Sequence, residues 1–343
     1  MSLLLLETLL AARGPLALCT VMQVKGSAPR HAGSWMLAGP EGLVAGSVGG
    51  GKGESLVLTA AREALADGKA RVLEVEMQGN EAEGMDMICG GTSRVLVELL
   101  VAKTVYEVAR DLLLHGERAV LARRFATGET FLMDGSGRWV PGLPEDADPE
   151  TAHRALDRGK PVLETEQGLF YDPLLPPEKL LILGGGHVGR ALASAAQPLG
   201  FAVTVADDRP EFLVPQRYPA GVATLCGGYA EIVDRFPFDA STYVVIVTRG
   251  HRADLESLRA VLERTWRYAG LIGSRRKVRL LTEQVLADGY DRARVESVHT
   301  PIGLDIGAET PEELAVSIAG ELVAVRRGAT SPGLSGGARR NAS

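Results

Sequence analysis

The stretch Leu180–Arg209, LLILGGGHVGRALASAAQPLGFAVTVADDR, reads as a strand, a glycine turn, a helix and a second strand that ends in acids. Its glycines Gly184, Gly186 and Gly189 have the spacing that lets a strand turn tightly into a helix while a phosphate approaches the bare backbone at the helix N-terminus. We therefore predict a site for a phosphate-bearing ligand at this turn. The alternative is that the glycines only permit the helix to pack closely on the strand.

Two acids, Asp207 and Asp208, end the second strand of this stretch. In nucleotide-binding folds an acid at this place holds a ribose hydroxyl and disfavours a 2′-phosphate. Together with the glycine turn, the two acids predict a nucleotide-like ligand more strongly than the glycines alone would.

The C-terminal part of the chain continues this alternation of strands and helices. The six predicted strands are LLILGGG, FAVTVADD, GVATLC, TYVVIVTRGH, YAGLIGS and RVESVHTPIG. This rhythm predicts a Rossmann-like, doubly wound parallel sheet. The last helix is well signalled, because Thr310 is an N-cap candidate followed by Pro311 at N1 and Glu313 at N3.

Three histidines fall in the glycine turn or at the ends of predicted strands. His187 lies inside the turn, His251 follows the strand YVVIVTRG, and His299 ends the predicted strand RVESV. We expect all three along the carboxyl edge of the sheet, where ligands of such folds bind. Because no HxH or HxxH spacing is present, hydrogen-bonded loop histidines are a better interpretation than a metal site.

A basic segment, GSRRK, also follows a predicted strand. Ser274, Arg275 and Arg276 precede a helical pattern there. Backbone donors and guanidinium groups at such a helix start favour an anion such as a pyrophosphate. The alternative is that these cations form a solvated helix face.

The organisation of the chain follows from these patterns and from its N-terminal half. Residues 1–140 alternate strands and helices, including a helix opened by GGGKGE and ended by Gly68, and predict a mixed α/β domain. Residues 141–177, rich in Pro, Asp and Glu, are interpreted as a connector with a short helix and a strand pair. The Rossmann-like domain is expected at 178–327 and a disordered tail at 328–343.

Composition excludes several classes of protein. The chain has 343 residues, 45% of them hydrophobic, and a formal net charge of -6, which argues against a general nucleic-acid or anionic-membrane surface. No apolar run approaches the roughly 20 residues that span a bilayer, and the apolar start lacks the basic region of a secretion signal. The three cysteines show no CxxC pair, so we expect reduced thiols and a cytoplasmic protein.

Taken together, the motifs resemble the XdhC/CoxI family of xanthine dehydrogenase accessory proteins. The resemblance runs from about Val21 to Val325 and rests on several stretches. They are GSAPRHAGSWML with GLVAGSVGGG, DMICGG, LLILGGGHVGRALA with VTVADDRPEF, and GLIGSRRK with HTPIGLDIGAETPEELAVSIAGEL. The last is far more specific than a glycine turn.

The resemblance implies a cofactor chaperone rather than an enzyme, with no catalytic residues to assign. Family members are two-domain proteins, often homodimers, that bind molybdenum cofactor as molybdopterin or its dinucleotide form. They help the cofactor acquire its terminal sulfur from a cysteine desulfurase and deliver it to apo-xanthine dehydrogenase or a related molybdenum hydroxylase. On this interpretation the glycine turn holds cofactor instead of NAD.

One departure from the family pattern concerns a thiol. Where the family commonly has a cysteine after the first Gly-rich segment, in a pattern like GGCVEG, this chain has GGGKGE with Lys52. Cys89, in MICGG, matches the family's second cysteine, and the resemblance implies that it contacts molybdenum or sulfur. The alternative is a small buried hydrophobe. Lys52 could instead supply a positive charge for oxyanions, or favour the Cys89 thiolate.

Two other functions remain open on the sequence alone. The glycine turn and acids also suit an NAD-dependent oxidoreductase, although the nearest approach to a catalytic pair is His251 with Asp254. A nucleotide-sensing regulatory module is the third possibility.

Overall fold

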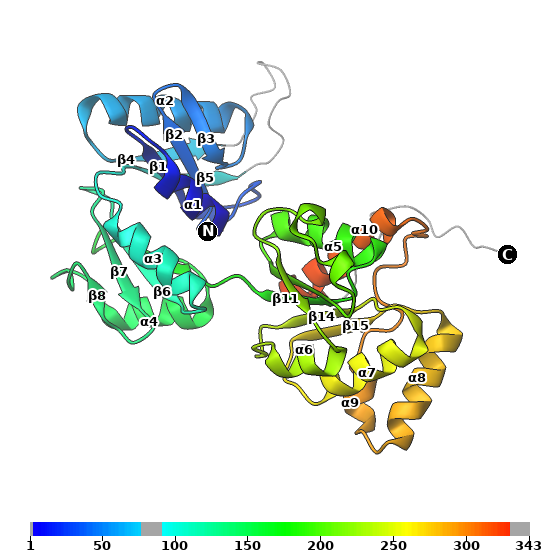
Figure 1. The fold of residues 1–343 in the computed structure, drawn as a ribbon. Helices are drawn as coiled ribbons and strands as arrows, with labels where there is room; N and C mark the ends of the chain where they lie inside the picture. Colours follow the sequence, from blue (N-terminus) through cyan, green and yellow to red (C-terminus); the bar gives the residue numbers. More distant parts are fainter. Residues whose placement is uncertain (1–2, 77–90, 330–343) are drawn as a thin grey trace. The chain divides into compact units, whose positions relative to one another are not determined.

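A computed structural model of the chain describes residues 3–76 and 91–329. The chain divides into two units, the first ending at Pro177 and the second beginning at Glu178 (Figure 1). Cys89 and nearly all of the tail predicted at 328–343 lie outside the described residues. Within the described residues, no helix combines the length and apolar character needed to cross a membrane.

The first unit contains two antiparallel five-stranded sheets, of which the N-terminal one has the order β3-β2-β1-β5-β4. Its strands are β1 (Ala17–Lys25), β2 (Trp35–Gly39), β3 (Gly42–Gly46), β4 (Arg71–Glu76) and β5 (Thr92–Leu99). Helix α2 (Gly51–Asp67) covers one face and ends at Gly68, whose left-handed conformation confirms the predicted C-cap. The other face is buried against α1 (Leu3–Ala11) and α3 (Thr104–Leu114).

The second sheet of this unit has the order β8-β7-β6-β10-β9. Its strands are β6 (Ala119–Arg124), β7 (Thr130–Asp134), β8 (Trp139–Val140), β9 (Val162–Glu164) and β10 (Leu169–Leu174), with α4 (Pro149–Arg158) on one face. The short helix and the strand pair predicted within 141–177 are present as α4 and as the paired strands β9 and β10. The interpretation of this segment as a connector is wrong, because β10 also pairs with β6 in the middle of the sheet. Asp148 is the N-cap of α4 and Pro149 its first residue, which are ordinary positions for these residue types, whereas Asp172 and Pro173 lie within β10.

The second unit is a parallel sheet with the order β13-β12-β11-β14-β15, which confirms the Rossmann-like prediction. Its strands are β11 (Lys179–Leu183), β12 (Ala202–Asp207), β13 (Ala223–Cys226), β14 (Tyr243–Ile246) and β15 (Tyr268–Leu271). Its helices are α5 (His187–Ala196), α6 (Tyr229–Arg235), α7 (Gly250–Leu262), α8 (Arg275–Ala287), α9 (Arg292–Glu296) and α10 (Pro311–Arg327). Three short 3₁₀ turns span Gln197–Leu199, Pro210–Phe212 and Pro215–Arg217.

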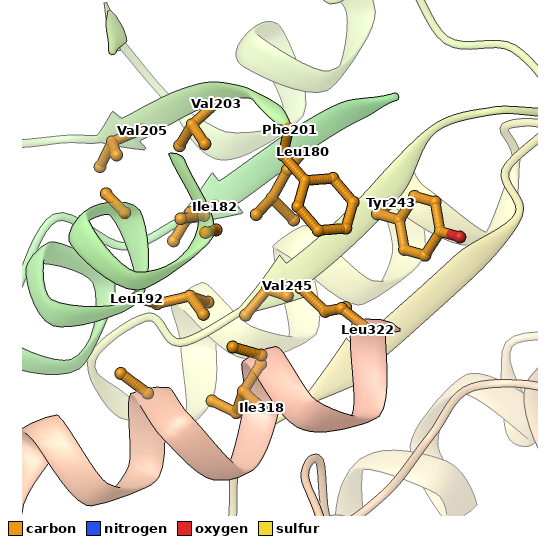
Figure 2. Packing of buried hydrophobic residues seen from close by; sticks show 14 of the residues in the cluster. Leu180, Ile182, Leu192, Phe201, Val203, Val205, Tyr243, Val245, Ile318 and Leu322 are labelled. Atoms are coloured by element: carbon orange, nitrogen blue, oxygen red, sulfur yellow. The ribbon is translucent and has the colours of Figure 1, made fainter. Parts of the chain in front are cut away.

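Helices cover both faces of this sheet (Figure 1). Figure 2 shows side chains of β11, β12 and β14 meeting those of α5 and α10, among them Ile182, Val245 and Ile318. Helices α6, α7 and α8 bury the opposite face. Such double coverage explains why the strands of this unit are continuous apolar runs in the sequence.

The sixth predicted strand of this unit is absent. RVESV forms the short helix α9, which Asp291 caps, and the segment rejoins the sheet through one parallel bridge between Gly270 and His299. The sequence of such a short segment does not distinguish a strand from a partly buried helical turn. Here Val295 and Val298 pack against the hydrophobic core on one face of the sheet.

Candidate functional site

The glycine turn joins β11 to α5 at the point where the strand order reverses between β11 and β14. Gly184 has φ +118°, and a Cβ there would meet the backbone of Val247 just after β14. A Cβ on Gly189 would overlap the carbonyl oxygen of Gly184. The requirement for glycine at these two positions is therefore explained by close packing of helix and strand, which was the alternative interpretation of the motif.

Gly186 is different, because a Cβ built on it meets nothing within 4 Å. It is the N-cap of α5, has φ -64°, and provides no side chain to cap the helix. The first N–H groups of a helix have no acceptor within the helix, and here His187, the first helical residue, is exposed. The space over Gly186 is thus open and bordered by backbone donors at the positive end of a helix, which suits a phosphate group.

Asp207, which we expected to hold a ribose hydroxyl, is fully buried and holds the protein itself. One carboxylate oxygen accepts a hydrogen bond from the Gly185 N–H at 2.7 Å and from Arg209 Nη2 at 3.1 Å. The other accepts from the Arg209 N–H at 3.0 Å and from its Nε at 2.8 Å. Asp207 therefore ties the glycine turn to the end of β12, while Asp208 beside it is exposed.

The surroundings of Asp207 keep it ionised. Burial acts to raise its pKa, but the hydrogen bonds from Arg209 and from the Gly185 N–H outweigh burial, so the pKa lies below its usual value. Tyr229, at the start of α6, is affected in the opposite sense, since burial and the charges of Asp207 and Asp208 raise its pKa.

Residues 209–218, which we call the cover segment, fold over the glycine turn. The Phe212 ring lies under two guanidinium groups, with the Cζ of Arg209 at 3.7 Å and that of Arg217 at 4.8 Å from its centroid. Arg217 Nη2 donates to the Gly185 carbonyl at 3.3 Å, and the Tyr218 hydroxyl donates to the Phe212 carbonyl at 2.7 Å. Our sequence reasoning missed these residues, although an arginine two positions after a strand-end acid was a signal for a local ion pair.

The end of β14 and the start of α7 form the next part of the carboxyl edge. His251 is exposed in the first turn of α7. Asp254, one turn on, is fully buried and contacts the Thr248 hydroxyl at 2.7 Å and Lys277 Nζ at 2.5 Å. These contacts join α7 to α8 and account for Asp254 without a catalytic pairing to His251.

The basic segment begins α8 as predicted. Ser274 is the N-cap, and its hydroxyl accepts from the Lys277 N–H at 3.3 Å. Arg275 and Arg276 are exposed in the first turn. Lys277 is committed to Asp254, so Arg275 and Arg276 are the members of this segment that can meet an anion at the carboxyl edge.

His299 does not join this edge. Its backbone bridges to Gly270, in the middle of β15, and its Nδ1 lies 2.9 Å from Glu321 of α10. Glu321 also accepts from the Tyr268 hydroxyl at 2.7 Å and from the Gly303 N–H at 2.7 Å. The prediction that His299 lies at the carboxyl edge of the sheet is therefore wrong. RVESV forms the helix α9 instead of a strand, and His299, which follows it, connects α10 to the sheet through Glu321.

The Gly-rich loop that precedes α2 in the first unit donates hydrogen bonds to the carboxylate of Glu54. Lys52 is exposed in the first turn of α2, and Glu54 accepts from the Ser47 hydroxyl at 2.7 Å and from the N–H groups of Val48 and Gly50 at 3.2 Å. Burial acts to raise the pKa of Glu54, but these hydrogen bonds lower it overall. The loop donors that an oxyanion would use are thus taken up by Glu54, which our sequence reasoning missed.

The thiols of the described residues differ in accessibility. Cys19 is buried in β1, and burial with the charge of Glu98 raises its pKa to about 12. Cys226 is exposed at the end of β13, opposite Asp207 in register. Within residues 3–76 and 91–329, His, Cys, Asp and Glu form no group of three that could hold a metal ion.

Comparison with known proteins places these features in a family. The model of the XdhC Rossmann domain matches residues 180–322, and the model of the XdhC and CoxI family matches residues 9–76. A crystal structure described as a xanthine dehydrogenase from Bacillus halodurans is 26% identical, with a TM-score of 0.82 over 97% of this chain and 98% of that chain.

Curated relatives align along most of the chain. The uncharacterized protein YqeB of Escherichia coli is 26% identical over 92% of this chain, which spans 44% of that relative's length. A Bacillus subtilis protein described as a probable subunit of xanthine dehydrogenase is 26% identical, over 94% of this chain and 97% of the relative. The molybdenum cofactor insertion chaperone PaoD of E. coli is 23% identical over 93% and 86%. With family models matching in both units and relatives aligned along nearly its whole length, the chain belongs to the XdhC and CoxI family.

Proposed function

We propose that this protein is an accessory protein that binds molybdenum cofactor and assists its maturation and insertion into xanthine dehydrogenase or a related molybdenum hydroxylase. The names of two relatives support the role, one a molybdenum cofactor insertion chaperone and the other a probable subunit of xanthine dehydrogenase. The observation that carries the proposal in this chain is the open, uncapped start of α5 at Gly186. A homodimer, and a cysteine desulfurase as sulfur donor, belong to the same proposal.

The residues of the glycine turn fit the phosphate end of such a cofactor. Gly186 leaves room, the first N–H groups of α5 donate, and the exposed cations Arg275 and Arg276 lie along the same edge of the sheet. These groups would bind and orient the cofactor by its phosphate. When bound, the cofactor would supply the molybdenum centre that the client enzyme uses.

A pair of matched glycine variants tests the site. Gly186→Val fills the open space at a position with φ -64° and ψ -162°, close to the extended region that valine adopts. We expect it to weaken equilibrium binding of purified molybdenum cofactor by about tenfold or more, the equivalent of about 1.4 kcal/mol. Gly228→Val is the control, since Gly228 is also an uncapped N-cap, with φ -65°, at the start of α6. Equal binding by both variants would place the cofactor elsewhere.

The arginines provide a second test of the same site. Arg275→Ala combined with Arg276→Ala removes two exposed charges and should weaken binding further at low salt than at high salt, because exposed charges are screened. A double variant that binds as the unaltered protein does at both salt concentrations would remove these residues from the proposal.

Cys89 is proposed as the contact to molybdenum or to the transferred sulfur, with Lys52 as the nearby positive charge. Cys89→Ser should then reduce delivery of cofactor to an apo-hydroxylase, whereas Cys226→Ser, which alters an exposed thiol of the second unit, should not. Lys52→Ala should slow alkylation of Cys89 at neutral pH if the two groups meet. Equal delivery by the Cys89→Ser and Cys226→Ser variants would remove the thiol from the mechanism.

A further inference from the structure

The end of β12 is occupied by the protein's own cation. In nucleotide-binding folds a ribose hydroxyl donates to an acid at this place. Here the two oxygens of Asp207 accept four hydrogen bonds, three of them from Arg209, and the carboxylate is fully buried. A ribose could reach Asp207 only by displacing the Arg209 guanidinium.

Arg209 is held in this position from a second side. Its guanidinium stacks on Phe212, whose ring also carries Arg217. Displacing Arg209 would therefore break a charge-assisted pair and a cation–π contact together. Binding of a ribose would have to compensate both losses.

The rest of the cover segment closes the neighbouring backbone. A Cβ on Gly185 would lie 2.9 Å from the Tyr218 hydroxyl and 3.3 Å from Phe212. One residue further, the space over Gly186 is open. The boundary between the closed and open parts of the turn thus falls between Gly185 and Gly186.

We propose that the cover segment determines the specificity of the glycine turn: it leaves the phosphate position at Gly186 accessible and closes the ribose position at Asp207, so that the turn accepts a phosphate or pyrophosphate group and rejects adenine dinucleotides such as NAD. This inference rests on the proposed function for the phosphate position only. It also gives a physical reason why a Rossmann-like unit in this chain need not bind a nicotinamide cofactor.

The test is titration calorimetry of the full chain with two probes, inorganic pyrophosphate and NAD. We expect the unaltered protein to bind pyrophosphate and to bind NAD at least about tenfold more weakly. Arg209→Ala should raise the affinity for NAD by about tenfold or more, the worth of a hydrogen bond to a charged group. This variant removes a positive charge, so simple electrostatics predicts the opposite result for an anionic ligand, and a gain can be attributed to opening of the ribose position.

Three further variants keep the test decisive. Phe212→Ala removes the cation–π contact of Arg209 while retaining its ion pair with Asp207, and should give a smaller gain in NAD affinity. If circular dichroism shows that Arg209→Ala does not fold, Phe212→Ala and Arg209→Lys take its place in the test. Asp208→Asn changes the charge at the exposed neighbouring acid, which lies 3.6 Å from Arg209 Nε. Because it leaves the hydrogen bonds between Arg209 and Asp207 in place, it should raise NAD affinity less than Arg209→Ala does.

The outcomes separate this inference from the proposed function. The inference is overturned if the unaltered protein binds NAD as tightly as pyrophosphate, if no folded variant of Arg209 or Phe212 gains NAD affinity, or if Asp208→Asn gains as much as they do. If the unaltered protein does not bind pyrophosphate, that result counts instead against the proposed phosphate site at Gly186. A gain of NAD affinity by Arg209→Ala would still support the role of the cover segment in that case.

Discussion

Two buried carboxylates, Asp207 in the second unit and Glu98 in the first, are stabilised to very different extents. Asp207 accepts four hydrogen bonds from two residues next to it in the fold. Glu98, on β5, lies 3.5 Å from Arg123 Nε, and neither of its oxygens has a hydrogen-bond donor among the described residues. Both side chains are almost wholly removed from water.

Glu98 belongs to a buried cluster between the two sheets of the first unit. Arg123, from β6, is fully buried, lies 2.8 Å from Asp172 of β10, and donates to the Thr20 hydroxyl of β1. Trp35 Nε1 donates to the same Asp172 oxygen at 2.6 Å, and its ring lies 4.3 Å from the Arg123 guanidinium. The Arg123 guanidinium is therefore the shared positive charge for Glu98 and Asp172, and it lies closer to Asp172.

The pKa values of Asp207 and Glu98 move in opposite directions because Asp207 has four hydrogen-bond donors and Glu98 only a shared cation. Burial raises the pKa of Glu98 to about 7, which the charge of Arg123 limits and that of Asp172 promotes. The other titratable groups facing Glu98 are Tyr106 and Cys19, whose own pKa values are raised by burial and by the Glu98 charge. The comparison shows that the number of donors, rather than burial alone, decides whether a buried acid in this chain is ionised.

The largest effect is expected from removing the shared cation. Arg123→Met would leave Glu98 and Asp172 buried without a positive charge, and should lower the free energy of unfolding of the first unit by about 3–5 kcal/mol. Urea unfolding followed by tryptophan fluorescence measures this in a Trp266→Phe background, where the remaining Trp35 and Trp139 both belong to the first unit.

The neighbouring arginine is the matched control. Arg124 contacts Glu129 and Asp146 at the surface, so Arg124→Met should cost no more than about 1 kcal/mol. If the two variants are equally stable, the cluster around Arg123 does not hold the sheets together as described.

A pH-dependent effect is expected next, at Glu98. A raised pKa means that the contribution of Glu98 to stability is fully present below its ordinary pKa of 4.5 and is lost as the pH rises through about 7. Glu98→Gln should therefore match the unaltered protein near pH 4 and exceed its stability at pH 8 by roughly 3 kcal/mol, since a tenfold change in proton affinity corresponds to about 1.4 kcal/mol. The measurement is urea unfolding at a series of pH values in the Trp266→Phe background.

Glu129→Gln controls for a carboxylate of the same unit whose pKa is shifted the other way. Hydrogen bonds from Thr127 and Arg124 lower the pKa of Glu129, so any pH-dependent difference should appear on the acid side. A Glu98→Gln variant that is less stable than the unaltered protein at pH 8 would mean that Glu98 is ionised and well paired.

The smallest effect is expected at Asp207, because water can partly replace its partner Arg209, which is 20% exposed. Asp207→Asn should destabilise the second unit by about 2 kcal/mol at neutral pH. Its lowered pKa places this contribution above the ordinary value of 3.8, and the difference from the unaltered protein should shrink as the pH falls below that value. Hydrogen exchange of peptides from β11 and β12, read by mass spectrometry, reports this unit directly.

Asp208→Asn is the control at the adjacent exposed position, where about 0.5 kcal/mol or less is expected. Faster exchange in the Asp208→Asn variant than in Asp207→Asn would show that the exposed acid, and not the buried one, secures the glycine turn.

Local sequence signals determined several elements of this fold completely. The last helix begins with the predicted capping box, in which the Thr310 hydroxyl accepts from the Glu313 N–H and the Glu313 carboxylate accepts from the Thr310 N–H. Gly68 ends α2 in the predicted left-handed conformation. The parallel sheet, its glycine turn and the helix start at Ser274 also follow from the sequence. The caps, the helix starts and the glycine turn depend on backbone conformation and hydrogen bonds within a few residues, so neighbours in the sequence suffice. The parallel sheet joins strands far apart in the chain, such as β11 and β14, and it was predicted from the repeated alternation of strands and helices.

Only the tertiary structure decided which polar groups are available for a ligand. Trp35 and Asp172 are 137 residues apart yet share a hydrogen bond. Residues 141–177 are part of a sheet because β10 pairs with β6, a strand that lies far from it in the sequence. The sequence placed Asp207 correctly at a strand end, but whether its oxygens face a ribose or Arg209 depends on how the cover segment folds back. Partners brought together by packing compete for each donor and acceptor, and that competition is settled by three-dimensional proximity, which residue spacing does not encode.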